Sequence, residues 1–318
     1  MKHLLLTAVA AVSFVLPASA DEPAPVPSPG EIAATAPAAD WTLIAPSDLL
    51  VMDLAPDAKG KPRRVVIQLM PAPFSQGWIG NIRMLAAVHW WDGTSVNRVQ
   101  DNYVVQWGDA TEKKALPEGL AVMAESGYVE SGFASAGVHA GVGGTERLLS
   151  VPVKTDAFSG LTGFWDGWPV AGAKEGYHVW PVHCYGAVGV GRNMSPDTGS
   201  GAELYTVIGH APRHLDRNIA VVGRVISGIE HLSSLPRGTG ALGFYEDPAE
   251  RVGIRSIRIA IELPAAEQPR FEYLSTESDS FARYADARAN RRDPFFITPA
   301  GGADICNIPV PIRPVVAK

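Results

Sequence analysis

Arg98 is the residue whose neighbours in the sequence best suit chemistry. It belongs to residues 92–109, which open on an Asp-Gly turn and continue as two short runs of alternating apolar and polar residues. Such alternation predicts two strands joined by a turn. Tyr103, Val104 and Gln106 add apolar surface and an amide beside a permanently charged guanidinium. Arginine on such a strand is either an ion-paired surface residue or a hydrogen-bond donor in a site.

Other residues with reactive side chains do not form a recognisable motif. His210 and His214 have the i, i+4 spacing of a helical metal pair, but Pro212 between them breaks a helix. The glycine repeats of residues 186–191 are not followed by a helical pattern, which argues against a dinucleotide-binding loop. No Gly-x-Ser-x-Gly elbow is present, and neither cysteine has a histidine at motif spacing. We therefore expect chemistry without a metal, a cofactor or a covalent intermediate.

The elements that would position Arg98 are mostly short strands. Alternating or apolar runs predict strands at 49–54, 65–69, 186–192, 203–208, 219–225 and 252–263. Two helices are expected, at 74–89 and 225–235; the first has its apolar stripe at Trp78, Ile82, Leu85 and Ala86. This pattern is typical of a closed β-barrel or a sandwich.

Two further regions interrupt or follow that pattern. Residues 110–185 have weak periodicity and predict a long, partly ordered excursion of loops with short strands at 147–153 and 177–182. Residues 265–318 form a C-terminal extension with one helical piece at 280–292, which we expect to pack back on the body. The barrel domain would then span 41–264.

The N-terminus predicts export. Lys2 precedes a mostly apolar run at 4–16, and Ala18-Ser19-Ala20 offers small residues for cleavage after Ala20, which is typical of a secretory signal peptide. A membrane anchor is the alternative, but the run is shorter than the roughly 20 residues of a span. Residues 21–40, rich in proline and alanine, are expected to be an extended, solvated linker.

Composition narrows the partners. The chain has 318 residues and a net charge of −6, so no basic surface for nucleic acid is indicated. Cys184 and Cys306 would meet an oxidising compartment after export, where they form either one disulfide or two separate buried thiols.

Two separated blocks resemble the cyclophilin family. Residues 92–99 and 103–109 are similar to the family's motif Asp-Gly-Thr-x-Phe-His-Arg-Val followed by Phe-Met-x-Gln-Gly-Gly-Asp, and residues 186–225 are similar to its second block. Order and spacing agree, and the resemblance covers about residues 65–109 and 186–263. It implies an eight-stranded antiparallel barrel capped by two helices, and peptidyl-prolyl cis-trans isomerase activity.

The same resemblance implies a set of site residues. The family's catalytic arginine falls on Arg98 and its neighbouring glutamine on Gln106. The apolar pocket for the prolyl ring falls on Tyr103, Val104, Tyr205 and Leu215, and the substrate-contacting loop on Gly191, Arg192 and Asn193.

This chain departs from the family pattern at several of these positions. The second glutamine is Glu203, the indole-bearing position is His214, and the late pocket histidine is Ile219. A carboxylate at Glu203 would either hold the Arg98 guanidinium in place or neutralise it and compete with substrate. In the first block, histidine, phenylalanine, methionine and glycine are replaced by Asn97, Tyr103, Val104 and Trp107, which we expect to keep a pocket of altered shape.

We therefore expect a monomeric, periplasmic prolyl isomerase acting on proline-containing polypeptides, with no cofactor. The main alternative is a binding or chaperone module with little turnover; Glu203 and the long excursion favour it, whereas intact Arg98 and Gln106 favour the enzyme. A metal-dependent hydrolase built on His210 and His214 is the third and weakest hypothesis.

Overall fold

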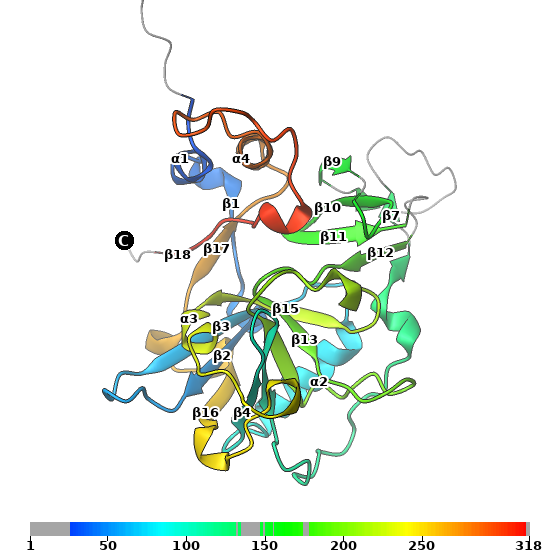
Figure 1. The fold of residues 1–318 in the computed structure, drawn as a ribbon, viewed down its shortest axis with the longest axis vertical. Helices are drawn as coiled ribbons and strands as arrows, with labels where there is room; N and C mark the ends of the chain where they lie inside the picture. The colour runs from blue at the N-terminus through cyan, green and yellow to red at the C-terminus, as the bar shows by residue number, and fades with distance from the viewer. Residues whose placement is uncertain are drawn as a thin grey trace, which may run out of the picture.

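Eight strands close into an antiparallel barrel, which confirms the predicted fold class. The computed structural model describes residues 26–131, 133–134, 147–148, 150–154, 156–173 and 178–315. The strand order around the barrel is β13-β14-β5-β4-β16-β2-β3-β15, and the barrel forms the lower part of the molecule in Figure 1. In chain order these strands are β2 (Leu49–Leu54), β3 (Arg63–Leu69), β4 (Ser95–Val99), β5 (Val104–Gly108), β13 (Ala187–Val190), β14 (Leu204–Val207), β15 (Val221–Ser227) and β16 (Val252–Ile259).

Strand β2 is an almost continuous apolar run because both of its faces are buried. Leu50 and Met52 belong to the core inside the barrel, whereas Leu49 and Val51 belong to a second core outside it. Strand β3 divides its side chains in the same way, with Val66 in the outer core. One arc of the barrel therefore lies beneath another layer of the protein.

Helix α2 (Gln76–Ala87) packs its apolar stripe against the barrel, as predicted. Trp78, Ile82 and Leu85 are fully buried in the barrel core. The indole N–H of Trp78 donates to the backbone oxygens of Thr198 and Gly199, 3.1 Å away in each case. The helix thereby also holds the loop between β13 and β14.

The second predicted helix is much shorter than expected. Strand β15 continues to Ser227, and only α3 (Glu230–Ser233) is α-helical within the predicted 225–235. Gly228, with φ of 81°, stands between the two elements. Its α-carbon lies against the Arg64 carbonyl, so close that a Cβ would approach it to 2.1 Å. Contact with β3 thus keeps this segment extended where the apolar periodicity alone favoured a helix.

The excursion at 110–185 contains a sheet, so the prediction of loops and short strands understates its order. Five strands run in the order β6-β12-β11-β10-β9. In chain order they are β6 (Glu130–Ser131), β9 (Ser150–Lys154), β10 (Leu161–Trp165), β11 (Trp168–Gly172) and β12 (His178–Pro181); a separate parallel pair joins β7 (Phe133–Ala134) to β8 (Arg147–Leu148). Asp166 and Gly167, both at positive φ, turn the β10–β11 hairpin. We call residues 110–185 the insertion below.

The predicted extended linker is wrong for its second half. Helix α1 (Pro29–Ala34) begins at a capping box formed by Ser28 and Glu31, and Ile32 is buried against α4 (Asp279–Ala289). In Figure 1 the two helices lie side by side at the top of the molecule. Local capping and the burial of Pro29, Ile32 and Ala36 fold the segment here. The signal peptide at 1–20 lies outside the described residues.

The C-terminal extension packs on the body, as predicted, and joins the outer core. Strands β1 (Trp41–Leu43), β17 (Phe271–Leu274) and β18 (Ile312–Pro314) form a sheet, and Phe281 of α4 packs edge-on against Phe164 of the insertion. A disulfide joins Cys184 to Cys306, with 5.1 Å between their α-carbons. Of the two alternatives left open by the sequence, the structure has the bridge. Among the helices of the described residues, none is long and apolar enough to span a bilayer.

We expect the disulfide to contribute strongly to stability because it closes 122 residues of sequence. Cross-linking so long a loop restricts the unfolded chain and stabilises the folded one by about 2–5 kcal/mol. Cys306→Ser should therefore lower the urea midpoint of unfolding substantially, and dithiothreitol should lower that of the wild type to a similar value. Dithiothreitol should leave Cys306→Ser unchanged, which is the control. Equal midpoints for oxidised and reduced wild type would contradict the prediction.

Candidate active site

Four neighbouring barrel strands bring the central site residues into one row. Gly189 of β13 pairs with Tyr205 of β14, Tyr205 with Gln106 of β5, and Gln106 with Arg98 of β4. Residues directly opposite in a sheet project on the same face. Val105, which precedes Gln106 along β5, is fully buried in the barrel core. Because neighbouring residues of a strand point to opposite faces, Gln106 and the rest of the row lie on the outer face. The register of the closed sheet therefore places Arg98 beside Gln106.

The Arg98 guanidinium is held by three acceptors. Its Nε donates to the Leu242 carbonyl over 2.8 Å, one terminal nitrogen donates to Gln106 Oε1 over 3.2 Å, and the other donates to Gln100 Oε1. These bonds use three of the five N–H groups that a guanidinium carries. One N–H on each terminal nitrogen remains for a ligand.

Aromatic rings flank the same guanidinium. Arg98 Cζ lies 5.8 Å from the ring centre of Tyr103 and 5.4 Å from that of Phe244. Partial burial lowers the pKa of Arg98, with desolvation as the main cause, but an arginine remains charged at any physiological pH. The site thus presents a desolvated, oriented cation at the edge of an aromatic surface.

Glu203 faces Gln106 rather than Arg98. Burial raises the pKa of its carboxyl, while hydrogen bonds from the Gln106 side chain, the Asp109 backbone N–H and the Asn97 side chain act in the opposite direction. Arg98 and Glu203 form no ion pair within 4 Å among the described residues. Gln106 therefore bridges them: its amide nitrogen serves the carboxylate and its oxygen accepts from Arg98. Direct neutralisation of Arg98 by Glu203, one of the two sequence hypotheses, is not what this geometry favours.

The predicted apolar pocket residues lie together around this row. Val104 and Tyr205 are buried, and Tyr103, Leu215 and Ile219 are partly buried against the barrel core. Leu215 ends the 3-10 turn η4 (Arg213–Leu215). The ring of exposed His214 stacks on Tyr103 with 6.2 Å between ring centres. These side chains come from β5 and the residue before it, from β14, and from η4 and the loop after it.

The predicted substrate loop, residues 191–193, is held by hydrogen bonds to neighbouring segments. Arg192 Nε donates to the Asn218 carbonyl over 3.0 Å, and the Gly191 N–H donates to the Glu203 carbonyl over 2.8 Å. Gly191 is packed so closely that a Cβ there would lie 2.9 Å from the Cβ of Glu203. Asn193 is exposed, and its N–H donates to Asp197. Hydrogen bonds therefore anchor the loop to Glu203 and to Asn218.

Some residues of the site differ from the sequence expectation. Trp107, expected to reshape the pocket, is fully buried in the barrel core instead, because it alternates with Gln106 along β5. Conversely, Gln100, Leu242 and Phe244 contact Arg98 and were not predicted. Leu242 and Phe244 lie at the turn η5 (Ala241–Gly243), far from Arg98 in sequence, where no local motif marks them.

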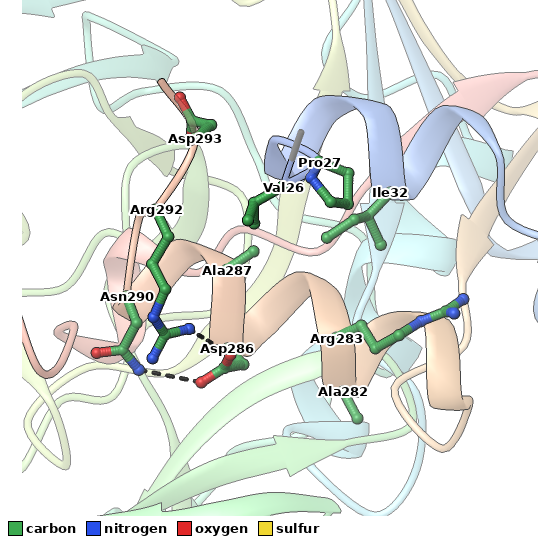
Figure 2. A pocket seen from close by; sticks show the side chains of 10 residues that line it. All are labelled: Val26, Pro27, Ile32, Ala282, Arg283, Asp286, Ala287, Asn290, Arg292 and Asp293. Atoms are coloured by element: carbon green, nitrogen blue, oxygen red, sulfur yellow. Dashed lines mark hydrogen bonds and ion pairs between the residues drawn. The ribbon is translucent and has the colours of Figure 1, made fainter. Parts of the chain in front are cut away.

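Two other features of the structure, the histidines and a cavity, are weaker candidates for a functional site. No group of three metal-ligating side chains gathers within the described residues, and His214 is engaged with Tyr103. A cavity of about 350 Å³ lies between α1 and α4, away from Arg98 (Figure 2). Its Asp286 is already bonded to Asn290 and Arg292. The row containing Arg98 is therefore the better candidate for the active site.

Comparison with known proteins agrees with this geometry. A family model described as cyclophilin type peptidyl-prolyl cis-trans isomerase/CLD matches residues 64–259. The chain belongs to this family. The matched region begins in β3, ends with β16 and contains every residue of the candidate site. The protein is thus a cyclophilin-type peptidyl-prolyl cis-trans isomerase. No curated protein sequence matches it.

Solved structures resemble this cyclophilin to different extents. Cyclophilin AquaCyp293 from Hirschia baltica is 21% identical, with a TM-score of 0.63 over 87% of this chain and 94% of that one. A cyclophilin type isomerase from Cryptosporidium parvum, solved with the dipeptide Ala-Pro, is 12% identical, with a TM-score of 0.36 over 66% and 98% of the two chains. The coverage of the first comparison means that its shared fold extends beyond the barrel.

Replacing Glu203 by glutamine should stabilise the protein in a pH-dependent way. The carboxyl has a raised pKa in the folded state, so its protonation favours folding at low pH, and this contribution is lost as the pH rises through the folded pKa. Glu203→Gln removes the buried charge and should raise Tm by a few degrees at pH 7.5. The gain should shrink toward about pH 4, where the wild-type carboxyl is protonated. Exposed Glu118→Gln is the matched control; a gain for Glu203→Gln that does not vary with pH would be evidence against the assignment.

Proposed function

We propose that this cyclophilin catalyses rotation about X–Pro bonds without a covalent intermediate, with Arg98 donating a hydrogen bond to the prolyl nitrogen. The observation that carries the proposal is the guanidinium held by three acceptors beside buried and partly buried apolar side chains, with two N–H groups left over. The substrate class is a proline-containing polypeptide, whose prolyl ring occupies the surface formed by Tyr103, Val104, Tyr205, Leu215 and Ile219.

Amide resonance sets the barrier that the site must lower. Rotation about a peptide bond faces about 18–20 kcal/mol because the C–N bond has partial double-bond character. Twisting the bond localises a lone pair on the prolyl nitrogen, and a donor placed there stabilises the twisted state. Removal of water by an apolar pocket disfavours the polar planar amide. A thousandfold acceleration requires about 4 kcal/mol, which one charge-assisted hydrogen bond plus desolvation supplies.

Gln106 and Glu203 serve this mechanism by orientation. The Glu203 carboxylate accepts from the Gln106 amide nitrogen, which turns the amide oxygen toward Arg98. The guanidinium therefore stays in one orientation before substrate arrives, and little ordering remains to be done in the transition state. In this arrangement Glu203 holds Arg98 indirectly, through Gln106, which is the first of the two roles considered from the sequence.

The proposed location is the periplasm, and the proposed state is a monomer. The apolar run after Lys2 and the small residues ending at Ala20 support export. The bridge between Cys184 and Cys306 supports an oxidising compartment, where disulfides persist. Substrates would then be exported polypeptides of the cell envelope.

Substitution of Arg98 tests the mechanism. We expect Arg98→Ala to lower kcat/KM on a Xaa-Pro peptide at least tenfold in a protease-coupled assay, the loss of about 1.4 kcal/mol or more of transition-state stabilisation. Arg98→Lys should also lose activity, because a point charge cannot keep the three anchoring bonds. Arg255, exposed on barrel strand β16, gives the control Arg255→Ala, which should match the wild type. Background rates in every variant, with retained peptide binding, would favour the binding module instead.

Export is tested by the mature N-terminus. The protein recovered from a periplasmic extract should begin at Asp21, as shown by N-terminal sequencing and by intact mass. Replacing Ala18 and Ala20 with bulky residues should block cleavage and leave the longer form. Recovery of a soluble cytoplasmic protein that begins at Met1 would exclude the proposed location.

A further inference from the structure

A buried histidine from the insertion contacts the floor of the proline pocket. His183, which follows β12, is completely buried. Its Nε2 lies 2.9 Å from the hydroxyl of Tyr205, and its Nδ1 lies 3.0 Å from Oδ1 of Asp216. The rings of His183 and Tyr205 are nearly parallel, at an angle of 10°. Both nitrogens of the imidazole are therefore engaged.

The partners of Asp216 assign the direction of these bonds. Asp216 also accepts from the His183 backbone N–H over 3.0 Å and from Arg213 Nε over 2.6 Å, so it acts purely as an acceptor. His183 Nδ1–H then donates to Asp216, and in the neutral imidazole Nε2 accepts from the Tyr205 hydroxyl. Burial raises the pKa of Tyr205 well above its usual value, which keeps the hydroxyl protonated as a donor.

Charged groups from three regions converge behind this chain of bonds. Arg213 NH1 donates to Asp156 of the insertion over 2.7 Å and lies 3.9 Å from Asp304 of the C-terminal extension. Asp216 and Arg213 belong to residues 213–219, the segment that supplies His214, Leu215 and Ile219 to the site. We call this segment the pocket loop. The insertion and the extension thus fix its inner side.

The Tyr205 ring also lies directly against the backbone of β13. A Cβ on Gly189 would lie 2.4 Å from the ring carbon that bears the hydroxyl, so only glycine lets the ring lie across this strand. Tyr205 is therefore held by both Gly189 and His183. Its hydroxyl cannot turn toward a substrate without abandoning the histidine.

We propose that His183 is a positioning residue of the isomerase site, which fixes Tyr205 through Nε2 and the pocket loop through Nδ1. The proposal rests on the function proposed above and adds that substrate affinity is set by the insertion, a region the barrel does not need for closure. His183 acts through Tyr205 and Asp216 and makes no contact with the reacting bond.

Two isosteric substitutions separate the two bonds. Asparagine places an amide near the Nδ1 position, so His183→Asn keeps the Asp216 bond and loses the Tyr205 bond; glutamine reaches the Nε2 position, so His183→Gln does the reverse. We expect His183→Asn to raise KM about five- to tenfold with kcat within about twofold, because a buried hydroxyl is left unpaired. His178→Asn, at an exposed histidine on β12, is the matched control and should leave both constants unchanged.

A double-mutant cycle then asks whether His183 acts through Tyr205. Tyr205→Phe should raise KM to a similar degree, and adding His183→Asn to it should have little further effect, because the bond is already absent. Additive effects, or an unchanged KM in either single variant, would overturn the proposal. Circular dichroism and Tm of each variant show whether a loss reflects unfolding; a variant that unfolds is replaced by Gly189→Ala, which displaces the Tyr205 ring at its contact with β13 and should likewise raise KM.

Hydrogen exchange tests the second bond without any substrate. Amides of the pocket loop should exchange faster in His183→Gln than in the wild type, and no faster in His183→Asn. Equal exchange in the wild type and His183→Gln would refute the coupling. If the wild type has no turnover, the Kd of a proline peptide replaces KM in the cycle; loss of turnover alone then counts against the proposed function, whereas unaltered exchange counts against the role of His183.

Discussion

Closure of the barrel is the constraint on which the rest of the structure depends. A closed sheet leaves no free edge, so the register of each strand is fixed by both neighbours at once. That register sets Gly189, Tyr205, Gln106 and Arg98 opposite one another on the outer face. The same closure divides β2 between two cores, because its outward side chains must be covered by the insertion and the extension. One arc of the barrel thus carries the row containing Arg98, while another is buried beneath the outer core.

Much of the barrel and of its central site follows from local sequence patterns. Alternation predicts the strands, helical spacing predicts α2, and two motif blocks place Arg98, Gln106 and Tyr205 correctly on neighbouring strands. Local signals also existed for two elements that were missed. Asp166-Gly167 between apolar runs is a hairpin signal, and Ser28 followed by Glu31 is a capping box. Both signals are short and lie in segments rich in proline and glycine, a composition that is more typical of linkers and loops.

The remaining features depend on contacts between residues far apart in the chain, which no local pattern encodes. Leu242 accepts from Arg98 across 144 positions, and Arg213 meets Asp156 across 57. The short α3 has the same origin, since contact between Gly228 and the Arg64 carbonyl overrides an apolar periodicity. Glu203 shows the limit most clearly. A glutamate at position 203 predicts a charge near Arg98. Only the position of Gln106 between Glu203 and Arg98 determines what that charge does.

The disulfide between Cys184 and Cys306 can form only after residue 306 has been synthesised. A chain that emerges N-terminus first, from a ribosome or through a membrane pore, presents residue 306 well after residue 184, 122 positions later. Every strand of the barrel, Arg98 and the pocket loop emerge before Asp304 and the second cysteine. The extension therefore joins the barrel only after the barrel strands are complete, and a product truncated before residue 304 would hold Arg98 in a barrel whose outer core lacks part of its cover.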